Sequence, residues 1–95
     1  MIMIKSFRGR ETEKVYSRHL SRKLPKDIQP AALRKLRMLN NSRGVQDLRE
    51  SPGNRLKKLK GDREGQYSIR VNDQWRICFR WDGADAWEVE ITDYH

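Results

Sequence analysis

The fold of this chain is decided by residues 67–91, with the sequence YSIRVNDQWRICFRWDGADAWEVEI. Apolar and polar residues alternate in three runs, the period expected of strands that bury one face. Asn72-Asp73 and Asp82-Gly83 separate the runs and are typical of tight hairpin turns. We therefore predict three antiparallel strands whose buried face carries Ile69, Val71, Trp75, Ile77, Phe79, Trp81, Trp87, Val89 and Ile91.

The flanking sequence predicts the remaining elements. A fourth strand over 55–60 ends at Gly61-Asp62, and another apolar run, 2–7, indicates a strand at the N-terminus. Helical spacing of apolar residues predicts two amphipathic helices, over 11–22 and from Asp27 to Asn40, whereas Ser51-Pro52-Gly53 marks 47–54 as a loop. The expected fold is α+β, in the order β-α-α-β-β-β-β, with both helices on one face of an antiparallel sheet.

The composition indicates one small basic domain spanning residues 1–95. Lys and Arg number 21 against 13 Asp and Glu, for a net charge of +8. This balance favours a polyanionic partner, above all nucleic acid, with an anionic membrane surface as the alternative. The sequence shows no apolar run of about 20 residues and no signal peptide. The single cysteine, Cys78, excludes an internal disulfide and fits a strand thiol, so we expect a reducing cytoplasm and no membrane association.

The predicted sheet carries cations on the face opposite its apolar side chains. The residues concerned are Arg70, Arg76 and Arg80, with Lys57 or Lys60 from the preceding strand and Arg63 from a turn. Such a face can bind a phosphodiester or stabilise the charge of a phosphoryl transition state. Alternatively it is an ordinary solvated face, with Arg76 and Arg80 paired to Glu88 and Glu90; the pattern does not decide between them.

The last predicted strand leads to Asp93-Tyr94-His95, a carboxylate, a phenol and an imidazole. An imidazole suits proton transfer near neutral pH, although a C-terminal histidine can equally be part of a solvated tail. His19 and His95 are the only histidines, and neither has neighbours at metal-ligand spacing. Of the possible enzymatic reactions, the residues therefore favour one that needs neither metal nor cofactor.

Four segments resemble a known family: MIKSF at 3–7, LKGDREG at 59–65, YSIRVNDQWRI at 67–77 and DYH at 93–95. They are similar to HigB-type toxins of the RelE/ParE superfamily, and the block 52–76 resembles the GraT-like branch. The resemblance implies a RelE-like fold and a type II toxin that cleaves messenger RNA on the ribosome. It also implies a cognate helix-turn-helix antitoxin, which would form a hetero-oligomeric, operator-binding complex with the toxin in the cytoplasm.

The resemblance carries active residues over to Lys60, Arg76, Asp93, Tyr94 and His95. Some HigB toxins have a histidine three residues before the lysine, where this chain has a second lysine, at position 57. In the implied reaction the RNA 2′-hydroxyl attacks the adjacent phosphate, which needs an acid, a base and positive charge. Two alternatives remain: an inhibitor of this fold that binds a protein such as DNA gyrase, and an RNA- or ribosome-binding module without chemistry.

Overall fold

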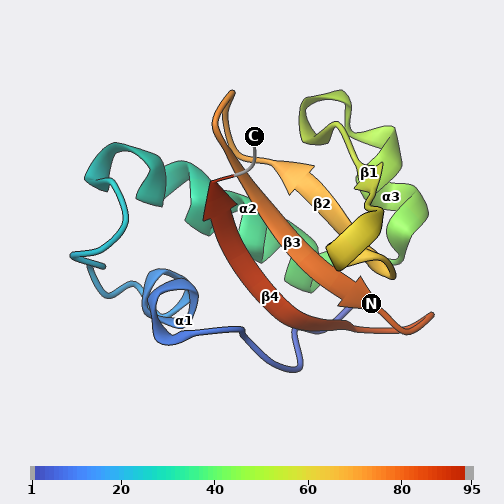
Figure 1. Cartoon of the computed structure of the whole chain (residues 1–95), viewed down its shortest axis with the longest axis horizontal. Helices are drawn as coiled ribbons and strands as arrows, with labels where there is room; N and C mark the ends of the chain where they lie inside the picture. Colours follow the sequence, from blue (N-terminus) through green and yellow to red (C-terminus); the bar gives the residue numbers. More distant parts are fainter. Residues whose placement is uncertain (1, 94–95) are drawn as a thin grey trace.

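The computed structural model of the chain describes residues 2–93 and forms an α+β sandwich of one sheet and a helical layer (Figure 1). The sheet is antiparallel with the order β1-β2-β3-β4, in which the strands are β1 (Lys57–Lys58), β2 (Gln66–Arg70), β3 (Trp75–Trp81) and β4 (Ala86–Asp93). The helices are α1 (Arg10–Tyr16), α2 (Gln29–Asn41) and α3 (Val45–Glu50). The described residues contain no helix that is long and apolar enough to cross a membrane.

The core lies between α2 and the three long strands. Ala32, Leu36 and Leu39 recur at helical spacing along α2 and are fully buried, as are Ile77 and Phe79 of β3. Pro30 stands in the first turn of α2, where its missing N–H costs no helical hydrogen bond. Replacing one of these buried leucines by alanine typically costs about 2–5 kcal/mol. This packing confirms the predicted α+β class and the helical stripe of the second helix.

The N-terminal half differs from the prediction in three details. Residues 2–7 form two isolated parallel bridges to β4, Ile4 to Ala86 and Phe7 to Val89, rather than a continuous strand. The first helix ends at Tyr16, because Arg18 adopts a left-handed φ of 63° that no α-helix continues. The stretch predicted as a loop, 47–54, overlaps α3, which buries Leu48 against the core.

The predicted inward orientation of Trp87 is wrong. A β-bulge shifts the register of β4 against β3 between Cys78 and Arg80, with Glu88 at a φ of 52°. One extra residue reverses the side on which the following side chains lie. Ala86 and Val89 are consequently both buried, whereas Trp87 is 39% exposed and lies opposite Arg80.

Asp82 organises the β3–β4 hairpin. Its carboxylate accepts hydrogen bonds from the N–H groups of Asp85 at 2.7 Å and Ala84 at 2.9 Å, and from Trp87 Nε1 at 2.7 Å. These donors, the Asp85 N–H foremost, hold the pKa of Asp82 below its ordinary value. The charged carboxylate is therefore the form that the folded hairpin favours.

We expect Asp82→Ala to lower the melting temperature at pH 7, because the hairpin donors lose their acceptor. A carboxylate whose pKa is lowered by folding stabilises the folded protein at pH values above its pKa in the unfolded chain, about 3.9 for aspartate. This stabilisation is lost as the pH falls through the pKa of the folded state. The difference in Tm between wild type and variant should therefore shrink as the pH is lowered below about 4. Thermal melts from pH 3 to 7 measure this, with Asp62→Ala in the exposed β1–β2 turn as control. A difference that stays constant over this range would contradict the assignment.

Candidate active site

Strand register brings four of the predicted cations, Lys57, Arg70, Arg76 and Arg80, onto one face of the sheet. Lys57 lies opposite Ser68, Ser68 opposite Cys78, and Arg70 opposite Arg76. Ile69 and Ile77 occupy the alternate positions and pack into the core, so this set points away from α2. We refer to this side as the outer face; Figure 1 views the sheet from it.

Arg76 is the anchored cation of the outer face. Only 7% of the residue is exposed, and its Nε donates to Ser68 Oγ at 2.7 Å. Nη2 donates to the carbonyl oxygens of Ser68 and Arg55. Arg55 has a left-handed φ of 42° in the loop before β1. Its carbonyl oxygen, one of the acceptors of Arg76, therefore comes from outside the sheet. Arg76 is therefore a positive charge held in a fixed position by β2 and by this loop.

The other arginines of the outer face form ion pairs. Arg80 Nε donates to Glu88 Oε2 at 2.7 Å, the pairing that the alternative of a solvated face gives for Arg80. Both side chains are about half exposed, so the pair contributes only about 0–1 kcal/mol to stability. Arg70 pairs with Asp73 across the β2–β3 turn.

Arg63 forms a long-range contact with β4. Its Nη2 lies 3.3 Å from Glu90 Oε1 on β4, and its Nη1 donates to Gln66 Oε1 at 3.2 Å. The guanidinium thus bridges β2 and β4 across the outer face. The charge of Arg63 is balanced by Glu90. Arg63 is therefore less suited to binding a phosphate than an exposed lysine such as Lys57.

Lys57, in β1, and Lys60, just after it, supply exposed charge at this side of the sheet. Both side chains are exposed, and within residues 2–93 neither takes part in an ion pair. Lys57 lies opposite Ser68, whose hydroxyl holds Arg76. Lys60 precedes the 3₁₀ turn Gly61–Arg63. An exposed ammonium group on the strand next to a fixed guanidinium, as at Lys57, suits an anion whose charge changes during a reaction.

Asp93 ends β4 on the rim of the sheet. It lies opposite Trp75 and accepts a hydrogen bond from Gln74 Nε2 at 2.9 Å. β4 is therefore paired with β3 up to Asp93. Tyr94 and His95 lie outside the described residues.

Cys78 is a structural thiol. It is fully buried in the middle of β3, and burial raises the pKa of the thiol above its ordinary value. A neutral buried thiol is a poor nucleophile. Residues 2–93 also contain no group of three or more His, Cys, Asp or Glu side chains that could hold a metal ion.

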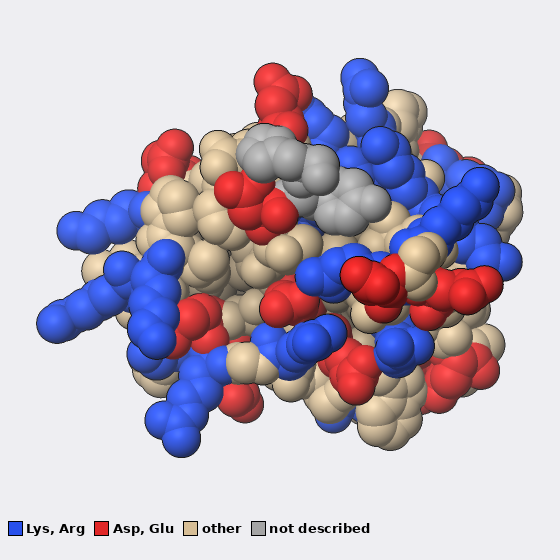
Figure 2. Space-filling view, in the orientation of Figure 1, with Lys and Arg blue, Asp and Glu red and all other residues tan. Residues whose placement is uncertain are grey.

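Sequence reasoning missed the residues that support the site. Ser68 was placed correctly by its alternation within β2, but nothing in the pattern indicated that its hydroxyl binds Arg76. The Arg55 carbonyl and the Gln74 amide had no recognisable signal either. Figure 2 shows basic side chains gathered where Figure 1 places β1 and α3, and a second basic group around the loop that follows α1.

Comparison with known proteins identifies the family. Residues 5–95 match the family of RelE-like toxins of the type II toxin–antitoxin system HigB. The chain is 40% identical over 82 residues to toxin HigB-1 of Vibrio cholerae, which covers 83% of this chain and 84% of that protein. It is 30% identical over 93 residues to the endoribonuclease HigB of Proteus vulgaris, which covers 98% of this chain and 100% of that protein.

Solved structures show the same fold. The YoeB dimer of Staphylococcus aureus superposes with a TM-score of 0.56 at 17% identity, over 99% of this chain and 97% of that one. The YoeB–YefM complex of the same organism gives a TM-score of 0.52 at 16% identity, over 100% and 98% of the two chains. With the family match over residues 5–95 and the similarity to toxin HigB-1, the chain belongs to the RelE-like toxins of HigB type II toxin–antitoxin systems.

Proposed function

We propose that this toxin is a ribosome-dependent endoribonuclease that cleaves messenger RNA. The observation that carries the proposal is the buried Arg76, fixed by Ser68 and Arg55 between the exposed Lys57 and the end of β4. A preorganised cation of this kind stabilises charge that develops at a phosphate without reorganising during the reaction. The name of the Proteus vulgaris relative, an endoribonuclease, supports the same activity.

The proposed reaction uses the RNA itself as nucleophile. The 2′-oxygen loses its proton to a base and forms a bond to the adjacent phosphorus, while the bond from phosphorus to the 5′-oxygen breaks. The products are a cyclic phosphate and a 5′-hydroxyl, which takes up a proton from an acid. His95 is the proposed acid–base group. In this proposal Tyr94 stacks on a nucleobase of the RNA or orients the phosphate. Asp93 fixes the terminal backbone or His95.

Positive charge for this reaction comes from three residues. Arg76 provides the fixed charge, and Lys57 and Lys60 neutralise the phosphate oxygens as the charge on them increases. Lys57 stands where some HigB toxins carry a histidine, so His95 is the single imidazole of the proposed site. Arg63, Arg70 and Arg80, whose charges are balanced by Glu90, Asp73 and Glu88, serve at most as outer contacts to the RNA backbone.

The partners follow from the family. A toxin of a type II system has an antitoxin partner, and we propose that this one is a helix-turn-helix protein. The two proteins would form a hetero-oligomer that binds their own operator. The ribosome would present the messenger RNA, and both events would take place in the cytoplasm. The net charge of +8 favours association with ribosomal RNA.

Transcript mapping after brief induction tests the function. Cuts confined to translated codons would support the ribosome-dependent endoribonuclease. Loss of plasmid supercoiling without cuts would instead support gyrase inhibition, the alternative known for ParE relatives of this fold. Translation arrest with intact transcripts and normal supercoiling would support a ribosome-binding module without chemistry.

We expect cleavage to need no divalent metal as a chemical participant, because Lys57, Lys60 and Arg76 supply the positive charge. The assay is cleavage of messenger RNA on programmed ribosomes in which magnesium is exchanged for other cations. Integrity of the ribosomes is checked in parallel, since chelation also dissociates them. Restoration of activity by one specific metal, at one equivalent per toxin, would contradict this expectation.

A further inference from the structure

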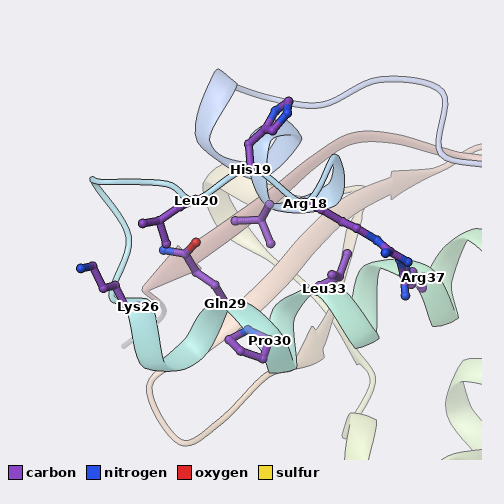
Figure 3. Close-up of a pocket in the computed structure, with 9 residues that line it drawn as sticks. Arg18, His19, Leu20, Lys26, Gln29, Pro30, Leu33 and Arg37 are labelled. Carbon is purple, nitrogen blue, oxygen red and sulfur yellow. The ribbon is translucent and has the colours of Figure 1, made fainter.

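An apolar groove lies between the end of α1 and α2. Its volume is about 520 Å³, and aliphatic side chains from both elements and from the loop between them form its floor (Figure 3). They are Val15, Leu20, Pro30 and Leu33. Leu20 is 57% exposed and lies after the end of α1, although the predicted first helix extended over 11–22. Exposed apolar surface gathered in a groove is typical of a binding site for a partner.

Hydrogen bonds fix the loop between α1 and α2 that contributes to the groove. Ser21 is fully buried, and its N–H donates to Gln29 Oε1 at 3.1 Å. Gln29 Nε2 donates in return to the carbonyl oxygens of Ser21 and Leu24, at 2.9 and 3.0 Å. The Ser21 hydroxyl donates to Glu11 at 2.6 Å, which ties the same loop to α1. A partner would therefore meet a preformed surface and would lose little free energy in ordering the loop.

The rim of the groove is cationic. Arg18, Lys26 and Arg37 line it, and no acidic residue does. In the part of the chain that the structure describes, none of the three takes part in an ion pair. Arg18 extends towards Arg37 across the groove in Figure 3. The surface thus combines an aliphatic floor with positive charge on its edges.

This combination fits an acidic amphipathic helix better than RNA. Proteins that bind single-stranded RNA stack its bases on aromatic rings, and no Phe, Tyr or Trp lines the groove, whereas the His19 ring at its edge points away from the floor (Figure 3). A helix lying in a groove instead places aliphatic residues spaced by three or four into the floor. Acidic residues on its flanks would then meet Arg18, Lys26 and Arg37.

We propose that this groove binds an acidic amphipathic helical segment of the antitoxin. The inference rests on the proposed toxin–antitoxin partnership and adds the surface and the chemistry of the contact. The groove lies at one end of the long axis of the molecule, by the loop that follows α1, whereas β1 lies towards the other end (Figure 1). The antitoxin contact is therefore separable from the outer face by mutation.

Affinity for the antitoxin encoded in the same operon tests the groove. The probe is the purified antitoxin, titrated calorimetrically into toxin that has been refolded after removal of co-expressed antitoxin. We expect Leu20→Asp to weaken binding at least about tenfold, as for truncation of a central interface anchor. Met3→Asp is the matched control, because Met3 is 54% exposed and lies outside the groove.

A second pair of variants tests the positive charge on the rim of the groove. Because these variants change exposed arginines, they test the groove independently of any misfolding of the Leu20→Asp variant. Arg37→Glu is expected to weaken binding at least about tenfold and to reduce its salt dependence, because it reverses one rim charge. Arg49→Glu, an exposed arginine on α3 outside the groove, is the control. Equal affinities for groove and control variants would overturn the proposal.

Ribosome-dependent cleavage by the same variants separates this inference from the proposed function. We expect the groove variants to cut messenger RNA as wild type does. Lost ribosome affinity with unchanged antitoxin affinity would overturn the proposal and assign the groove to ribosomal RNA. A wild-type toxin that cuts no RNA, but loses antitoxin affinity on Leu20→Asp, would refute the proposed activity and support the groove.

Discussion

Removal of His95, or its replacement by alanine, is expected to abolish messenger RNA cleavage while the protein stays folded. A positioned acid–base group contributes about 10²- to 10⁴-fold in rate, and the proposed site has one imidazole. The other histidine, His19, is exposed after α1, and its ring points away from the groove floor in Figure 3. Growth after induction and single-turnover cleavage on programmed ribosomes measure the effect.

His19→Ala is the matched control for this experiment. It removes an imidazole of the same chemistry from a place without a proposed role in cleavage, so its activity should equal that of wild type. Circular dichroism and thermal melts show whether each variant is folded. Full growth arrest by a folded variant that lacks His95 would show that the residue is dispensable and would favour a toxin that binds without cutting.

Arg76→Ala is expected to reduce cleavage far more than Arg80→Ala, although both residues belong to β3. Loss of a contact to the transition-state phosphate costs several kcal/mol, roughly hundreds-fold in rate. The exposed Arg80–Glu88 pair is worth only about 0–1 kcal/mol of stability, and its loss should leave the rate nearly unchanged. Single-turnover cleavage by the two variants measures the difference.

Stability must be measured beside activity, because Arg76 is buried. Alanine at this position leaves Ser68 Oγ and the Arg55 carbonyl without the guanidinium, which costs about 1–3 kcal/mol. Arg76→Lys keeps the positive charge but cannot reproduce the planar fork, so it should fall between wild type and alanine in rate. Equal cleavage by the Arg76→Ala and Arg80→Ala variants would move the active centre towards the β3–β4 hairpin.

Local patterns were sufficient for the regular part of the fold. Alternation with a period of two predicted β2 and β3 to within a residue or two, because each side chain on a half-buried strand faces either the core or the opposite side. The pattern failed at Trp87, where one bulged residue reversed that relation. It also missed α3, since so short a helix depends on tertiary packing, here of Leu48, more than on its own propensity.

The sequence by itself determined the α+β class, the basic charge and the HigB-like order of residues, because each can be recognised from neighbouring positions in the chain. Only the tertiary structure decided which cations are fixed and which are balanced by acids. Arg76 is held by Ser68 and Arg55, which are 8 and 21 residues away, and Arg63 pairs with Glu90 at a separation of 27. The groove between α1 and α2 depends in the same way on where one helix stops and how the next packs. Such contacts arise only when distant segments are brought together by burial of the core, and no local pattern specifies them.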